Sequence, residues 1–164
     1  MEGIFPWFYW LFPIAFVIHN AEEAMLFPKW SQSAGRYHRP VGRAEFGFAV
    51  MVLNALGFFI TAGFYVAPDS SFFRYFFFVF NLAMLINVFF PHLVVTVAMR
   101  RYMPGLGTGL GLLLPVTLVI LIHGERRGAF TFPRLVLYAV PLTAVVVGSI
   151  PLLFKLGRRL DSAL

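Results

Sequence analysis

A histidine and two glutamates lie close together early in the chain, in the segment His-Asn-Ala-Glu-Glu at positions 19–23. Successive residues of a helix are about 100° apart, so Glu22 and Glu23 lie about 60° and 40° to either side of His19 on one helix face. Each carboxylate costs about 2.5–3.5 kcal/mol inside a lipid bilayer, and such residues usually mark a functional site. We therefore predict that His19, Glu22 and Glu23 are catalytic residues.

A second histidine, His92, follows Pro91 in a later apolar segment. A proline kinks a helix and frees a backbone carbonyl, and the two apolar segments place His92 at a membrane depth similar to that of His19. Because a catalytic zinc takes about three protein ligands and one water, we predict a metal site formed by His19, Glu23 and His92. A ligand atom of His92 should then lie roughly 4–5 Å from one of His19 or Glu23. Iron or manganese suits the same set of nitrogen and oxygen ligands.

Two kinds of reaction are compatible with these residues. With a divalent metal bound, Glu22 is left free as the general base that activates the bound water or removes a substrate proton. Helix geometry also allows the two glutamates to exchange the roles of ligand and base. Without a metal, Glu22 and Glu23 form an acid/base pair, because two neighbouring carboxylates disfavour joint ionisation. The sequence leaves both versions open.

Three asparagines inside the apolar segments are candidates for substrate binding: Asn54, Asn81 and Asn87. On an ideal helix Asn81 nearly shares the face of His92, whereas Asn87 lies about 140° away from it. The alternative is that each asparagine forms a hydrogen bond between helices and holds the bundle together.

The loop after the first apolar segment is basic, with the sequence RYHRPVGR at positions 36–43. We predict that Arg36, Arg39 and Arg43 bind substrate by clamping a phosphate-bearing headgroup. The alternative is that these residues only set the membrane orientation and contact anionic lipid.

The composition places the chain in a membrane. Of its 164 residues, 60% are hydrophobic and 12% are charged, whereas a soluble domain has about 45–50% and 25%. These values exclude a soluble domain, a disordered chain and a disulfide-rich secreted fold. The net charge of +6 is explained by membrane orientation, so we predict no nucleic-acid partner, and the absence of cysteine excludes thiolate chemistry.

Five stretches approach the roughly 20 mostly apolar residues of a membrane-spanning helix. They cover residues 4–27, 44–66, 72–98, 106–122 and 135–154. The connecting segments are short and no repeat is visible, so we predict an all-α integral membrane bundle that forms a single domain over residues 1–164. Four aromatic residues should lie at the membrane interfaces, namely Trp7, Tyr9, Trp10 and Trp30.

The lysines and arginines of short loops predict the orientation. Nine of the thirteen basic residues fall in the first loop, the third loop and the C-terminal tail, which share one side of a five-span bundle. The other four are Arg74, Arg126, Arg127 and Arg134. This asymmetry predicts a multi-pass protein of the cell membrane with its N-terminus outside and its C-terminus in the cytoplasm.

The segment at positions 19–23 also carries a family resemblance. Its place near the end of the first apolar segment resembles the HXXEE-domain membrane proteins, and residues 92–104 resemble the later region of that family. The likeness covers most of the chain. The family is named for its motif and its function is uncharacterised, so the resemblance implies that His19, Glu22 and Glu23 matter without implying a reaction.

These residues predict an intramembrane enzyme that acts on a lipid or isoprenoid-like substrate, by metal-dependent hydrolysis or by acid/base chemistry. Its partners are then membrane lipid and a lipid-soluble substrate that enters sideways from the bilayer. Because intramembrane glutamates and histidines also build proton relays, proton- or ion-coupled transport, including a homo-oligomeric channel, is the first alternative. The second is a structural accessory subunit whose polar cluster docks a partner helix.

Overall fold

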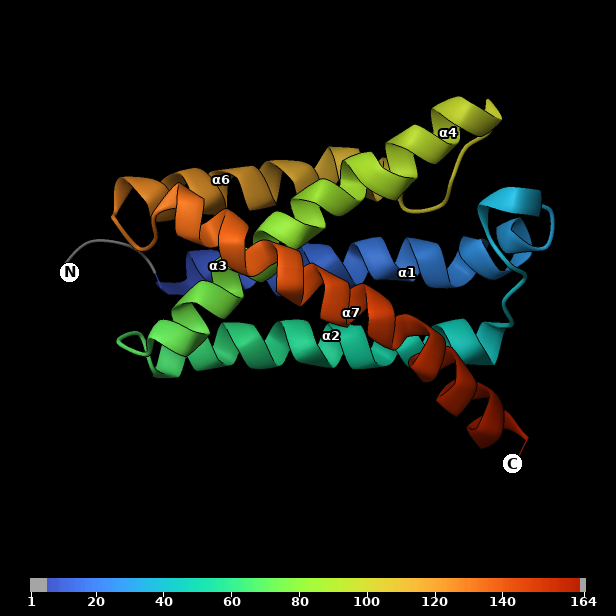
Figure 1. Cartoon of the computed structure of the whole chain (residues 1–164), viewed down its shortest axis with the longest axis horizontal. Coiled ribbons are helices and arrows are strands. Elements are labelled where there is room, and N and C mark those ends of the chain that lie inside the picture. The colour runs from blue at the N-terminus through green and yellow to red at the C-terminus, as the bar shows by residue number, and fades with distance from the viewer. Residues whose placement is uncertain (1–5, 163–164) are drawn as a thin grey trace.

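The computed structural model describes residues 6–162, and every regular element in that range is a helix. Long helices run back and forth along one axis (Figure 1). The first two long helices are α1 (Leu11–Ser31) and α2 (Arg43–Val66). The next is a composite of α3 (Ser71–Asn87), the wider-turned segment η3 (Val88–Leu93) and α4 (Val94–Met99). A second composite consists of α5 (Leu106–Thr108), the wider-turned η4 (Gly109–Leu113) and α6 (Leu114–Arg126). The chain ends with α7 (Phe132–Asp161), and short 3₁₀ turns occupy Pro6–Trp10 and Gly35–Tyr37.

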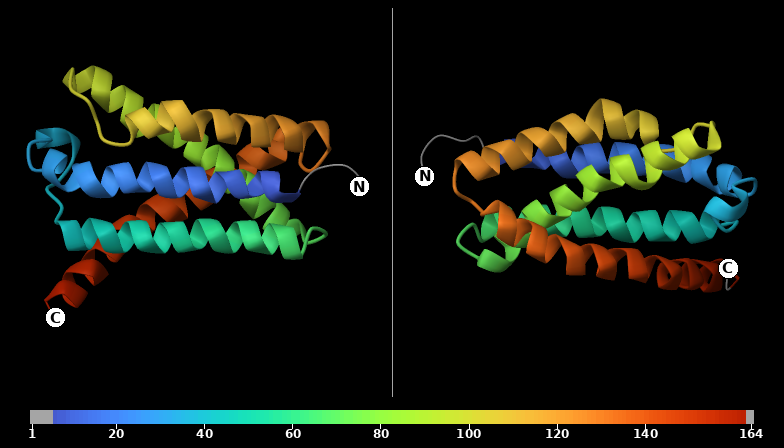
Figure 2. Two further views of the ribbon diagram at one scale, coloured as in Figure 1. Left: turned by 180° about the vertical axis from the view of Figure 1, so that it is seen from behind. Right: turned by 45° about the horizontal axis from the view of Figure 1, so that its top comes forward.

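The all-α prediction is confirmed, with one difference in the number of spans. Within the described residues, four helices are long and apolar enough to cross a membrane: Arg43–Val66, Ser71–Met99, Leu106–Arg126 and Phe132–Asp161. The α1 helix, expected as a fifth span, is not among them, because the polar residues at positions 19–23 lower its mean hydropathy. It still packs alongside α2 within the bundle (Figure 2). The expected start of this span, residues 4 and 5, lies outside the described residues.

Large apolar side chains cover much of the outer surface of the bundle. On α7, for example, Leu137, Val140 and Val145 are 67%, 68% and 68% exposed. Soluble monomers rarely expose apolar patches larger than a few hundred Å². The outer surface of α7 is therefore suited to contact with lipid.

Phenyl rings pack the interior of the half that lies toward the turn at residues 67–70. Phe12 of α1 meets Phe77 and Phe80 of α3 edge-on, with ring centroids 6.0 and 5.7 Å apart. Phe64 of α2 stacks on Phe77 at 4.7 Å. Apolar helices gain little from leaving lipid, so close packing of such rings is what holds α1, α2 and α3 together.

A second aromatic cluster fills the opposite half of the bundle. Phe27 of α1 stacks on Phe46 of α2 at 4.8 Å and lies 5.2 Å from Trp30. Trp30, expected at the membrane interface, is only 4% exposed, because α1 continues to Ser31 and Val41 of the first loop packs over it. The polar segment at positions 19–23 lies between the two aromatic clusters.

The helix that carries His92 is kinked just before it. Phe90 has the non-helical angles φ −129° and ψ 116°, and Pro91 follows. A proline removes one backbone hydrogen bond and clashes with the preceding turn, as expected from the sequence. Beyond the break, α4 continues to the end of the bundle that holds the first loop (Figure 1).

The loops that carry most of the basic residues lie at one end of the bundle, as their distribution in the sequence predicted. The first loop, the segment at 100–105 and the end of α7 lie at one end of the bundle, and the turns at 67–70 and 127–131 lie at the other (Figure 1). The nine basic residues counted above therefore gather at a single end. Which membrane face this end occupies stays a prediction.

Cysteine labelling tests the orientation, since the chain contains no cysteine. We expect Ser33→Cys, in the exposed first loop, to react with a membrane-impermeant maleimide only after the cells are permeabilised. Asp69→Cys, in the exposed turn at the other end, should react in intact cells. The reverse pattern for the pair would overturn the orientation with the C-terminus in the cytoplasm.

Candidate metal centre

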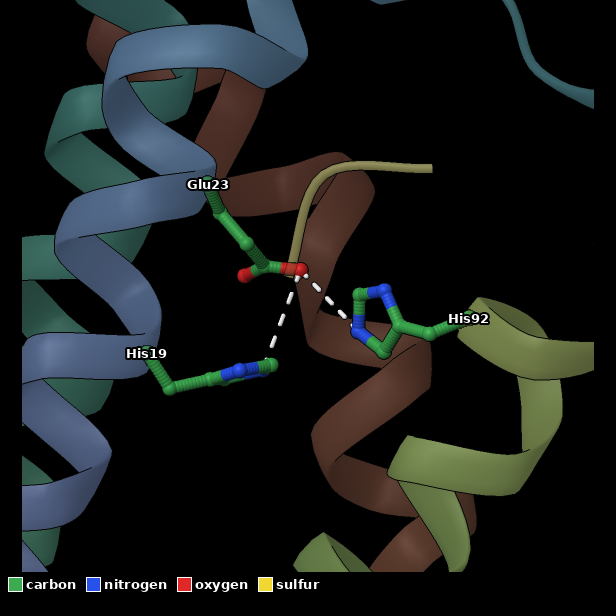
Figure 3. A group of neighbouring side chains, drawn as sticks. All are labelled: His19, Glu23 and His92. Carbon is green, nitrogen blue, oxygen red and sulfur yellow. Dashed lines mark ion pairs between the residues drawn. The ribbon is translucent and has the colours of Figure 1, made fainter. Parts of the chain in front are cut away.

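His19 and Glu23 of α1 meet His92 of η3 inside the bundle. Glu23 Oε1 lies 3.2 Å from His92 Nε2 and 4.0 Å from His19 Nε2. One ligand atom from each of the three residues lies within 4.8 Å of the other two. Figure 3 shows the Glu23 carboxylate pointing into the space between the two imidazole rings. The proximity expected from matched membrane depth is therefore confirmed.

The burial and hydrogen bonding of these side chains fit a bound cation. The two histidines are 1% exposed and Glu23 is 15% exposed. Within the described part of the chain, His19 Nε2 has no hydrogen-bond partner, which is costly for a buried polar atom. Ligand atoms of a tetrahedral zinc lie about 3.3 Å apart, so the spacing of Glu23 and His92 already fits, and His19 must come slightly closer.

A residue outside the cluster orients each histidine ring. Thr108 Oγ1 lies 3.3 Å from His19 Nδ1, which leaves Nε2 of that ring facing Glu23. A contact of this kind fixes the tautomer and direction of a metal-binding histidine. Asn87 Nδ2 lies 3.0 Å from His92 Nε2, which is the nitrogen that also faces Glu23.

Glu22 has a different set of partners from its neighbour Glu23. It accepts hydrogen bonds from the Tyr102 hydroxyl, from the Gly105 N–H at 2.8 Å, and from the Thr108 N–H and hydroxyl at 3.0 and 2.6 Å. Its carboxylate therefore anchors the N-terminal end of the helix that begins at Leu106, where backbone N–H groups lack partners within the helix. Four donors also stabilise the charged carboxylate and make it a weak base. These contacts favour a positioning role for Glu22 over the general base expected from helix geometry.

Tyr102 completes this anchor from the loop outside the helices. Burial and the hydrogen bond to Glu22 raise the pKa of Tyr102 above its ordinary value. The phenol therefore keeps the proton that it donates to Glu22. The same oxygen accepts the Gly107 N–H at 2.8 Å, which ties the loop to itself.

The backbone of Gly105 closes the centre from the loop side. A Cβ at this position would lie 2.6 Å from His92 Cε1 and 3.0 Å from both Glu23 Cγ and His19 Cε1. The residue also has φ +93°, which favours glycine. Only a residue without a side chain can therefore cover the three candidate ligands in this way.

Asn87 and Asn81 lie differently relative to His92 from what an ideal helix predicts. Asn87 contacts His92, although an ideal helix placed it on another face, because the break at Phe90 rotates the following turn. Asn81, expected on the face of His92, instead donates to the Phe77 carbonyl of its own helix at 2.9 Å.

Asn54 forms a hydrogen bond between helices, which is the alternative to substrate binding considered from the sequence. It accepts a hydrogen bond from Asn20 Nδ2 at 2.6 Å, which links α2 to α1 one residue away from His19. This bond joins two helices inside the bundle.

The three arginines proposed as a phosphate clamp do not come together at the centre. Arg36 and Arg39 are exposed in the first loop, and Arg43 begins α2 and faces the end of α7. None of them lines the cavity beside Glu23 and His92. Arg36 contacts a lining residue, because its guanidinium donates to the hydroxyl of Tyr37 at 3.3 Å.

Over residues 6–162 the fold and the centre define a class: an all-helical bundle with four helices able to cross a membrane and a largely buried His/Glu/His group. The chain belongs to the family described as "Protein of unknown function with HXXEE motif", which matches residues 10–120. Residues His19, Glu22 and Glu23 are the letters of that motif. The chain is also 36% identical over 150 residues to the "Uncharacterized protein YrkK" of Bacillus subtilis (strain 168). The aligned residues cover 92% of this chain and 95% of that protein. No solved structure matches the chain.

A pair of glycine substitutions tests the close contact at Gly105. We expect Gly105→Ala to lower the free energy of unfolding by about 1–3 kcal/mol, because the residue has positive φ and its Cβ would meet His92. Gly111→Ala is the control, since nothing lies within 4 Å of its Cβ position. Thermal unfolding of the two purified variants in detergent measures the difference, and equal stabilities would contradict the packing described.

Proposed function

We propose that this protein is a metal-dependent intramembrane enzyme that acts on a lipid or isoprenoid-like substrate. The observation that carries the proposal is the convergence of His19, Glu23 and His92, with ligand atoms within 4.8 Å, beside a largely apolar cavity that Glu23 and His92 line. Buried ionisable groups inside a bundle are costly, and they usually mark a functional site.

The three residues bind one divalent cation and leave a coordination position free for water or substrate. Such a cation lowers the pKa of bound water and polarises a carbonyl or phosphoryl oxygen. Two imidazoles and one carboxylate suit zinc, and they also suit iron or manganese. Hydrolysis of an ester-like bond in a lipid is the reaction that this chemistry supports best.

Glu22 acts in this proposal through the loop and not on the substrate. It holds Gly105 over the three ligands and holds Thr108 beside the ring of His19. Glu22 is thus a positioning residue, and Glu23 is the carboxylate that belongs to the centre.

A metal-free enzyme is the second candidate, and one observation favours it. Glu23 Oε1 lies 3.2 Å from His92 Nε2, which is hydrogen-bonding distance for a carboxylate and an imidazole. That pair replaces the pair of Glu22 and Glu23 expected from the sequence, because the two glutamates have different partners. It would exchange a proton with substrate as a general acid and base.

Elemental analysis of the purified protein tests the metal proposal. We expect about one equivalent of zinc, iron or manganese per chain in the wild type, and a loss of most of it in His19→Ala and His92→Ala. His123→Ala is the matched control, because His123 packs against Phe8 and Tyr9 outside the candidate centre. A metal-free wild type after expression in metal-supplemented medium would leave the Glu23–His92 pair as the surviving enzyme model.

Replacement of the two glutamates separates their roles. We expect Glu23→Gln to lower metal occupancy at least about tenfold, because the cation loses its only anionic ligand. Glu22→Gln should keep the metal but lower thermal stability, because a charged acceptor of four hydrogen bonds becomes neutral. Metal content and thermal unfolding of the two variants decide the assignment, and equal metal loss in both would make Glu22 a ligand as well.

A further inference from the structure

A cavity of about 220 Å³ lies beside the candidate metal centre, between α1, α2, η3 and α7. Its deep part is lined by Phe16, Leu53 and Met84, and its part nearer the basic end by Phe27 and Phe46. Ligand pockets in proteins usually measure about 300–1,000 Å³. This cavity is smaller than that range, so its size favours one hydrocarbon chain over two.

Polar groups occupy a restricted part of the cavity wall. Asn20, Glu23, Asn87 and His92 line it at the level of the candidate centre, while most other lining residues are apolar. An apolar body with a few placed polar groups is the usual composition of a site for a small amphiphilic ligand. The polar wall therefore marks the level at which the functional group of a ligand lies.

The position of Glu23 along α1 divides the cavity into two arms. Phe16 at the deep end and Trp30 at the basic end each lie seven residues from Glu23, which is about 10 Å along a helix. A ligand that fills the cavity therefore presents an internal bond to Glu23 and His92, with about 10 Å of molecule on each side.

The end of the cavity near the first loop suits a negatively charged group. Trp30 is 4% exposed, and its Nε1–H has no hydrogen-bond partner among the described residues. Tyr37 and His38 line the same end, and the guanidinium of Arg36 sits 5.2 Å from the Tyr37 ring centroid. A buried unpartnered donor beside a basic loop attracts an anionic headgroup.

We infer that this cavity binds a single-chain anionic amphiphile, with its hydrocarbon end toward Phe16 and its headgroup at Trp30. The inference rests on the proposed function, since it names the substrate class of the same centre. Val147 of α7 lines the cavity and is 57% exposed, so the chain can enter from the lipid at this point. The small volume of the cavity disfavours a diacyl lipid, whose second chain would have to lie outside it.

Quenching of Trp30 fluorescence tests the inference. The full-length protein with Trp7→Phe and Trp10→Phe, in nanodiscs of neutral phospholipid, has Trp30 as its single tryptophan. The probes are stearic acids with a nitroxide either near the carboxylate or near the methyl end. We expect saturable quenching that unlabelled stearic acid reverses, and stronger quenching by the label near the carboxylate. Stearyl alcohol should compete about tenfold more weakly, because it lacks the charge that strengthens the hydrogen bond.

Matched substitutions on α2 separate cavity binding from partition into the bilayer. Ala49→Leu places extra side chain in the cavity and should weaken binding at least about tenfold. Ala55→Leu makes the same change on an exposed face of the helix and should leave binding unchanged. Val50→Phe is a second cavity-filling variant, used if Ala49→Leu loses the wild-type thermal transition.

The outcomes distinguish this inference from the proposed function. Equal quenching in the wild type and in both cavity-filling variants would overturn the inference, even with a metal bound. Stronger quenching from the methyl-end label, or competition by a diacyl phospholipid as effective as that by stearic acid, would overturn it as well. Saturable binding that Ala49→Leu or Val50→Phe abolishes in a protein without metal would support the cavity inference and contradict the metal centre.

Discussion

The hydrogen bonds that Glu22 of α1 accepts are the interaction on which the arrangement of this bundle depends. Its carboxylate receives two backbone N–H groups and two hydroxyl groups from residues 102–108. The two N–H groups lie where a helix begins and have no acceptor within that helix. A charged acceptor is especially effective there, because the helix N-terminus carries partial positive charge and water is scarce. The first and fourth long helices are thereby fixed at one relative height.

The same interaction builds the candidate centre. Because Glu22 and Glu23 are adjacent on a helix, their side chains point about 100° apart and meet different neighbours. Thr108 links the two sets of contacts, since it donates to Glu22 and also contacts the His19 ring. A displacement of the loop would therefore rotate a candidate ligand as well as release an anchor. The spacing of the motif therefore lets α1 anchor residues 102–108 on one face and contribute to the candidate centre on the adjoining face.

The proximity of His92 to the motif could be predicted from the sequence, because it follows from counting residues along two apolar segments. A rise of 1.5 Å per residue is a local property that lipid does not alter. The contact between Asn87 and His92 could not be predicted in this way, because the break at Phe90 changes the rotation that an ideal helix assigns.

Contacts between distant segments explain the other differences. The partners of Glu22 lie 80 or more residues away in the chain, so no pattern within α1 indicates them. That Gly105 covers the centre follows only from the fold, because it depends on how the loop at 100–105 lies against α1 and η3. Trp30 was expected at the interface from its residue type, and the first loop buries it.

The cavity beside the candidate centre is open toward the lipid at α7, where Val147 lines it and is 57% exposed. A molecule that arrives past Val147 diffuses in two dimensions, so its effective concentration is its mole fraction among the lipids of the membrane. Diluting the suspension leaves that quantity unchanged, whereas adding inert lipid lowers it. A water-soluble molecule, by contrast, follows its ordinary bulk concentration, so binding from the lipid and binding from water respond differently to added lipid.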